Sequence, residues 1–78
     1  MALFAVEGTI EPFEDFSIRF KPDSNGEGPT HLDFERSAFF PDPDPFEPTR
    51  CRAWFEMTTR GPMLWFFEAG NIKFIKVR

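Results

Sequence analysis

Apolar and polar residues alternate along several short segments of the chain. In the clearest of them, the apolar residues Phe16, Ile18 and Phe20 alternate with polar ones, which are Ser17, Arg19 and Lys21. Successive side chains of an extended strand point to opposite faces, so this pattern predicts a half-buried strand with a basic outer face.

Similar patterns predict strands at five further places, over residues 3–10, 31–40, 50–58, 63–68 and 72–77. A short helix is the alternative for 31–40. The run at 63–68 is almost continuously apolar, which favours a strand covered on both faces. Near the C-terminus, Phe74 and Ile75 interrupt the alternation and indicate either a β-bulge or coverage of both faces.

Proline, glycine and short polar residues separate these segments. Glu11-Pro12 is expected to close the first strand, and residues 22–30, which are rich in turn formers, are expected to form a loop. Residues 41–48 contain four prolines in eight positions, which removes amide donors and fixes φ, so we expect an extended, stiff connector there. Ala69-Gly70-Asn71 is typical of a tight hairpin. The pattern as a whole predicts an all-β protein.

We expect a single small domain over residues 1–78, with the proline-rich connector at 41–48. Its five to six short antiparallel strands, joined by meander connections, would form a small barrel or a two-layer sandwich. Both architectures give the same alternation, so the pattern leaves the two open.

The chain has more aromatic residues than one small core needs. Twelve of its 78 residues are phenylalanine and two are tryptophan. Phe39-Phe40 and Phe66-Phe67 are consecutive pairs that cannot both face one side of a strand, and Phe46 lies inside the connector. Exposed aromatic side chains on a small domain usually mark a partner surface. The alternative is that the connector folds back and Phe46 caps its own barrel.

Charge is distributed unevenly along the chain. Residues 1–48 contain eleven acidic and three basic residues, whereas residues 49–78 contain two acidic and six basic ones. The simpler explanation is that strands from the two halves lie side by side and pair their charges across the sheet. The other is a two-faced surface that orients partners in an assembly.

The inventory of reactive side chains predicts no catalytic, metal or cofactor site. One histidine, one cysteine and no tyrosine are too few for a histidine-dependent triad or for a metal site built on several His or Cys ligands. Residues 23–28 resemble the start of a calcium loop, but the twelfth position is Phe34 where a bidentate glutamate is required. We therefore expect a non-enzymatic protein.

The N-terminus lacks the basic region of a signal peptide, and no apolar run reaches the length of a membrane span. The single Cys51 cannot form an intramolecular disulfide, which fits a reducing compartment. We expect a cytoplasmic protein, or one in the host cytoplasm or an assembled particle if it is viral or from a phage.

These observations predict a protein-binding module that acts as a small structural subunit of a larger assembly or as a compact virus-type inhibitor of a host protein. The expected partner is another protein or a second copy of the chain. The alternative is a nucleic-acid role, either single-strand binding through the basic and aromatic C-terminal half or mimicry of nucleic acid by the acidic half. The residues predicted to contact the partner are Phe39, Phe40, Phe46, Arg50, Arg52 and Trp54.

Overall fold

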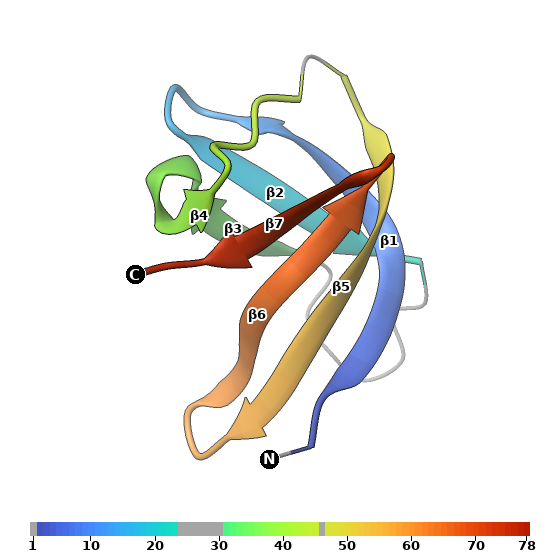
Figure 1. Cartoon of the computed structure of the whole chain (residues 1–78), viewed down its shortest axis with the longest axis vertical. Helices are drawn as coiled ribbons and strands as arrows, with labels where there is room; N and C mark the ends of the chain where they lie inside the picture. Colours follow the sequence, from blue (N-terminus) through green and yellow to red (C-terminus); the bar gives the residue numbers. More distant parts are fainter. Residues whose placement is uncertain (1, 24–30, 46) are drawn as a thin grey trace.

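The computed structural model describes residues 2–23, 31–45 and 47–78 and contains seven β-strands in that part of the chain. Figure 1 shows them wrapped around a common interior. In chain order the elements are β1 (Phe4–Phe13), β2 (Ser17–Pro22), β3 (Leu32–Glu35), the 3-10 turn η1 (Arg36–Ala38), β4 (Phe39–Phe40), β5 (Thr49–Thr58), β6 (Gly61–Ala69) and β7 (Ile72–Lys76).

All seven strands belong to one antiparallel sheet with the order β3-β2-β1-β5-β6-β7-β4. The two edge strands, β3 and β4, follow each other in the sequence, so η1 brings the edges of the sheet together (Figure 1). Phe34 of β3 and Phe39 of β4 meet edge to face across this seam, with ring centroids 6.2 Å apart. The all-β prediction is confirmed, and the sheet is a nearly closed barrel with one strand more than the predicted five to six.

The extra strand arises because the predicted strand at 31–40 is divided by η1. After β3, the Arg36 amide donates a hydrogen bond to the carbonyl of Phe16 (2.9 Å), and the chain turns away from β2. Beyond the turn, the Val77 amide donates to the carbonyl of Ala38 (2.8 Å), which places β4 beside β7. Strand and short helix therefore both occur in a segment for which they were alternatives.

The first strand is longer than predicted and runs through Pro12 to Phe13. Pro12 is opposite Ile18 of β2, whereas β5 pairs with β1 only as far as Ile10. One side of β1 is therefore unpaired at Pro12, and a proline without an amide donor is tolerated there.

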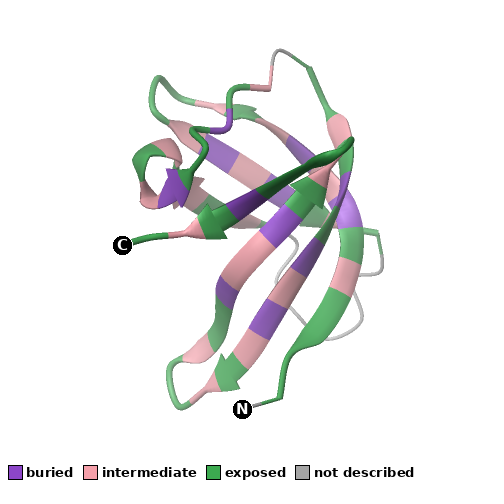
Figure 2. Ribbon diagram, viewed as in Figure 1, coloured by how far each residue is buried: buried purple, intermediate pink, exposed green. Residues whose placement is uncertain are grey.

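The core consists of the inward-facing residues of the barrel, visible as the buried bands along the strands in Figure 2. Phe67 is at its centre: its ring stacks on Phe74 at 4.8 Å and meets Phe39 edge to face at 5.2 Å. Gly8 lies against Phe20, and a Cβ at this position would be 2.5 Å from the Lys21 carbonyl oxygen. The buried apolar residues are Ile10, Ile18, Phe20, Phe39, Cys51, Ala53, Phe55, Leu64, Phe67 and Phe74.

A β-bulge in β6 explains its continuous apolar run. The register with β5 shifts between Trp54 and Phe55, so that Leu64 and Phe67 are both buried while the two residues between them are half-buried on the other side. The prediction that β6 is covered on both faces is wrong, because Trp65 and Phe66 are only half-buried and Glu68 is exposed.

The bulge or double coverage predicted at Phe74–Ile75 is also wrong. β7 pairs with β6 in a continuous register, Phe67 with Phe74 and Phe66 with Ile75. Phe74 is buried, whereas Ile75 is 48% exposed. The sequence shows two consecutive apolar residues here because one serves the core and the other lies on the surface.

The proline connector crosses one end of the barrel (Figure 1). Pro43 is fully buried, and together with Pro45 it lines a small cavity of about 150 Å³ against Ile10 and Phe74. The Arg36 guanidinium holds the connector by bonding Asp42 (3.1 and 3.2 Å) and Asp44 (3.3 Å). The described part of the connector is therefore a cap on the barrel and not a projecting arm.

Candidate functional site

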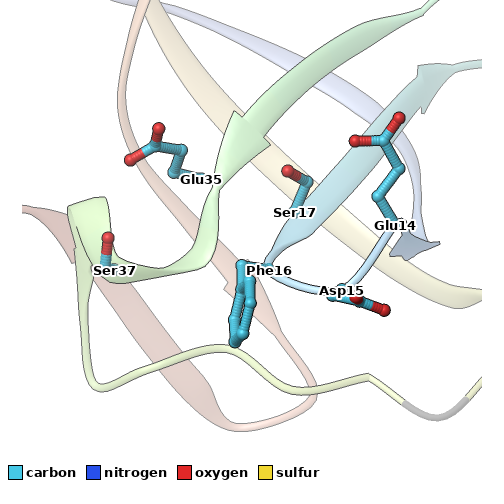
Figure 3. Close-up of a pocket in the computed structure, with 6 residues that line it drawn as sticks. All are labelled: Glu14, Asp15, Phe16, Ser17, Glu35 and Ser37. Carbon is cyan, nitrogen blue, oxygen red and sulfur yellow. The ribbon is translucent and has the colours of Figure 1, made fainter.

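The first candidate is an open depression of about 580 Å³ between the β1–β2 turn and η1 (Figure 3). Phe16 projects from this turn and is 78% exposed. The prediction that Phe16 faces inward from a strand is wrong, because β2 begins at Ser17 and residues 14–16 form the turn, with Glu14 at φ 56°. The lining residues are Glu14, Asp15, Phe16, Ser17, Glu35 and Ser37.

The depression is acidic, but its carboxylates do not converge. In Figure 3 the Asp15 carboxylate points away from Glu35, and Glu14 lies on the far side of Ser17. Within the described residues, no group of three or more His, Cys, Asp or Glu side chains could hold a metal ion. The depression therefore offers an exposed aromatic ring in an acidic setting, without an arrangement for acid–base or metal chemistry.

The second candidate is the side of the sheet that faces away from the core. We call it the outer face and define it by the outward residues of β4, β7, β6, β5 and β1. The pairing aligns an apolar row across it, since Phe40 is opposite Ile75, Ile75 opposite Phe66, Phe66 opposite Trp54, and Trp54 opposite Ala5.

The members of this apolar row are partly open to solvent. Phe40 is 71% exposed and Ile75 48%, while Phe66 and Trp54 are half-buried. Trp54 and Phe66 cover one another by stacking, with centroids 4.7 Å apart and planes at 19°. Trp65, displaced outward by the bulge, donates a hydrogen bond from Nε1 to Glu56 Oε1 at 3.0 Å. The bulge therefore adds an indole to the same side of the sheet.

A charged row runs beside the apolar row. The pairing aligns Lys73 of β7, Glu68 of β6, Arg52 of β5 and Glu7 of β1, so the sign of the charge alternates from strand to strand. Lys73 Nζ lies 4.2 Å from the centroid of the Phe66 ring, which joins the two rows by a cation–π contact.

Arginine side chains from the second half of the chain bind carboxylates from the first half on this face. Arg52 donates two hydrogen bonds to Glu7 (3.0 and 3.1 Å), and Arg50 donates two to Asp23 (2.6 and 2.7 Å). These bonds hold the pKa of both Glu7 and Asp23 below their ordinary values. The expectation that strands from the two halves pair their charges is confirmed for Glu7 of β1 and Arg52 of β5, which are directly opposite, whereas Asp23 follows the end of β2.

Other basic residues find partners within the first half. Arg19 donates two hydrogen bonds to Asp33 (2.7 and 3.2 Å), which lowers the pKa of that carboxyl group, and its guanidinium lies over the Phe13 ring at 3.8 Å. Lys21 pairs with Glu11 at 2.9 Å. The division of charge in the sequence therefore does not produce two oppositely charged faces on these strands.

The residues predicted to contact a partner fall into three groups. The first group lies on the outer face and consists of Phe40, Trp54, Arg50 and Arg52. The two arginines in it are already bound to carboxylates. Phe39 is only 4% exposed and packs in the core. The prediction that it contacts a partner is therefore wrong, because its side chain is not on the surface.

Phe46 lies outside the described residues, as do residues 24–30, which include most of the calcium-like segment and most of the predicted loop. Sequence reasoning did not select Phe66, Ile75, Lys73 or Glu68 for the site. The signal for Phe66 and Ile75 was present, because each is one member of a consecutive apolar pair whose other member is buried.

Cys51 faces the core, where burial raises the pKa of its thiol to about 12. A thiol that remains protonated near neutral pH is a poor nucleophile, so this residue serves packing. His31 lies 3.9 Å from Asp33 at the start of β3. Neither side chain is part of the outer face.

Comparisons with known proteins found no matching family model, no similar curated protein and no similar solved structure. Among the described residues, no helix has the length and apolar character needed to cross a membrane.

Proposed function

We propose that this chain is a non-enzymatic protein-binding module that works as a small structural subunit of a larger assembly or as a compact virus-type inhibitor of a host protein. Its binding surface is the outer face. The observation that supports this proposal is the apolar row from Phe40 to Trp54, which remains partly exposed although the core is complete without it.

The arrangement of this row suits protein recognition. Aromatic side chains bury a large area while fixing few torsions, and they are enriched at the centres of protein interfaces. The stacked Trp54–Phe66 pair would form the anchor at the centre of the face, and the charged row would form part of its polar rim.

The nucleic-acid alternative has less support from this geometry. Both guanidinium groups that would meet phosphate, those of Arg50 and Arg52, are bonded at short distance to carboxylates. A phosphate would have to displace Asp23 or Glu7 or approach a site that is already neutralised, and the net charge of −4 opposes its approach.

Photo-crosslinking at single positions tests the proposal. A benzophenone amino acid replaces Phe40 in one variant and Phe16 in a control variant, because both phenylalanines are highly exposed but only Phe40 lies on the outer face. Irradiation of the pure protein and of the protein in cell lysate should give discrete crosslinked products from position 40 and not from position 16. Products from position 16 alone would move the binding surface to the acidic depression.

A second measurement addresses nucleic acid directly. Anisotropy of a labelled single-stranded oligonucleotide should remain unchanged when the protein is added at low salt. Binding that is lost in the folded variant R50E/R52E would replace the proposed function with single-strand recognition.

A further inference from the structure

The order of charges in the charged row of the outer face indicates which kind of partner would fit this face. The charged row has four members, Lys73, Glu68, Arg52 and Glu7, one on each of four neighbouring strands. Because the signs alternate and the number of members is even, reversing the row converts every positive position into a negative one. A surface with this property is complementary to a reversed copy of itself.

We infer that a second copy of this chain binds the outer face, forming a face-to-face dimer with twofold symmetry. This inference rests on the proposed function, in which the outer face binds protein, and deepens it by naming the partner. In a twofold dimer the same patch is used by both subunits, so the patch must be self-complementary.

The direction of the twofold axis follows from the row. An axis parallel to the strands and passing between β5 and β6 reverses the order of strands in the facing sheet. Lys73 then faces Glu7 of the other copy, and Glu68 faces Arg52 of the other copy. An axis perpendicular to the strands would place like charges opposite one another, which opposes association.

The same axis places the aromatic residues together. Trp54 and Phe66 lie on the two strands beside the axis, so the stacked pair of one copy meets the stacked pair of the other, Trp54 against Phe66 in both directions. The result is a cluster of four rings at the centre of the interface. This is the position at which aromatic anchors contribute most to binding.

The charges within each chain permit this contact. Among the described residues, Glu68 forms no salt bridge, although its charge helps to raise the pKa of Arg52, and Nζ of Lys73 lies over the ring of Phe66. Arg52 and Glu7 are already bonded to each other (3.0 and 3.1 Å), so they would keep this pair and meet Glu68 and Lys73 of the other copy as second partners. The row carries two positive and two negative groups, so the row itself is neutral although the chain carries −4.

The required area is also within reach of a small barrel. A stable interface buries about 800 Å² on each partner. That is about 15% of the 5435 Å² accessible surface of this chain.

The first experiment is sedimentation velocity on the wild-type protein over roughly a hundredfold range of concentration. We expect a monomer–dimer equilibrium with a limiting mass of twice the monomer. A single monomeric species at every concentration would overturn the inference.

The decisive experiment uses two charge-reversal variants, K73E and E7K. In either homodimer, each of the two symmetry-related contacts becomes a like-charge pair, so dimerisation should weaken by about tenfold or more. When the two variants are mixed, Glu at position 73 meets Lys at position 7, and Lys73 meets Glu7 in the other contact. The heterodimer should therefore regain an affinity near that of the wild type.

Matched controls are K21E and E35K, which make the same charge changes on β2 and β3, outside the outer face. They should dimerise like the wild-type protein, and circular dichroism verifies that every variant is folded. If E7K does not fold because the bond between Glu7 and Arg52 is lost, E68K replaces it: this variant keeps that bond and places a positive charge at position 68 opposite Arg52 in both contacts, so it should weaken dimerisation as K73E does.

The outcomes separate this inference from the proposed function. A monomeric wild-type protein that still crosslinks from position 40 to a different protein would overturn the dimer while the binding role of the outer face stands. A dimer that is unaffected by both reversals would place the interface elsewhere and overturn the inference. Loss in each variant with recovery on mixing would establish the twofold arrangement.

Discussion

The inner and outer faces of β5, β6 and β7 both carry apolar side chains, but those on the inner face are buried in the core and those on the outer face contact solvent. On the inner face, Phe67 and Phe74 stack and are 1% and 9% exposed. On the outer face, Phe66 and Ile75 occupy the neighbouring positions in the same strands and remain in contact with solvent. Aromatic content alone therefore does not measure the size of a core, because the side of the sheet on which a ring lies determines whether it is buried.

The largest difference between the faces should appear in the cost of removing a ring. Phe67→Ala leaves a cavity at the centre of the core and should lower the free energy of unfolding by about 3–5 kcal/mol. Phe66→Ala removes a half-buried ring stacked on one neighbour and should cost about 1 kcal/mol. Urea denaturation of the two variants measures both values. Equal costs would mean that the outer row is part of the core.

The reactivity of a thiol at two neighbouring positions of β5, residues 51 and 52, compares the inner face with the outer face. The thiol of Cys51 is buried with its pKa raised to about 12, whereas residue 52 is exposed. At pH 8, Ellman's reagent should modify Cys51 about a thousandfold more slowly than the thiol of the variant C51A/R52C, because burial limits both access and ionisation. Similar rates in the folded proteins would contradict the assignment of the two positions to opposite faces.

The inner face should also reject added volume that the outer face accepts. A Cβ at Gly8 would lie 2.5 Å from a backbone oxygen of Lys21 and 2.6 Å from the Phe20 ring. Gly8→Ala should therefore lower the free energy of unfolding by about 1–3 kcal/mol. Ala5→Val, which adds two methyl groups at an exposed outward position of the same strand, is the matched control and should change it little. Thermal unfolding monitored by circular dichroism distinguishes the two.

The smallest effect should come from the exposed ion pairs of the outer surface. Arginine side chains lower the pKa of Glu7, Asp23 and Asp33 in the folded state. A lowered pKa adds stability at pH values above the unfolded pKa near 4, and this contribution disappears as the pH falls through the folded values.

The free energy of unfolding should therefore decrease between about pH 5 and pH 2, and urea titrations at several pH values measure the slope. The variant E7Q/D23N/D33N should show a shallower slope. An unchanged slope in this variant would assign the acid sensitivity to other carboxyl groups.

Much of the fold could be predicted from period-two alternation and from the positions of proline and glycine. The predicted hairpin at Ala69-Gly70-Asn71 is present, with Gly70 at φ 64° between β6 and β7. The strand over 50–58 lies within β5. These features are local: a side-chain pattern and a turn residue are sufficient to specify them.

The candidate site was only partly predictable. Trp54 and Phe40 were selected because they are aromatic, and so was Phe39, which the same reasoning could not distinguish from Phe40. The division between them depends on how β4 pairs with β7, a contact between segments more than thirty residues apart in the sequence.

The all-β class, the turns and the alternation of faces follow from local patterns, because they depend on residues that are neighbours in the sequence. Contacts between distant segments settle which face is inside, where the β6 bulge lies, and that the proline connector closes the barrel end with Pro43 buried. It also aligned Lys73, Glu68, Arg52 and Glu7 into one row. Such alignments depend on register between distant strands, and register is fixed by the packing of the whole core.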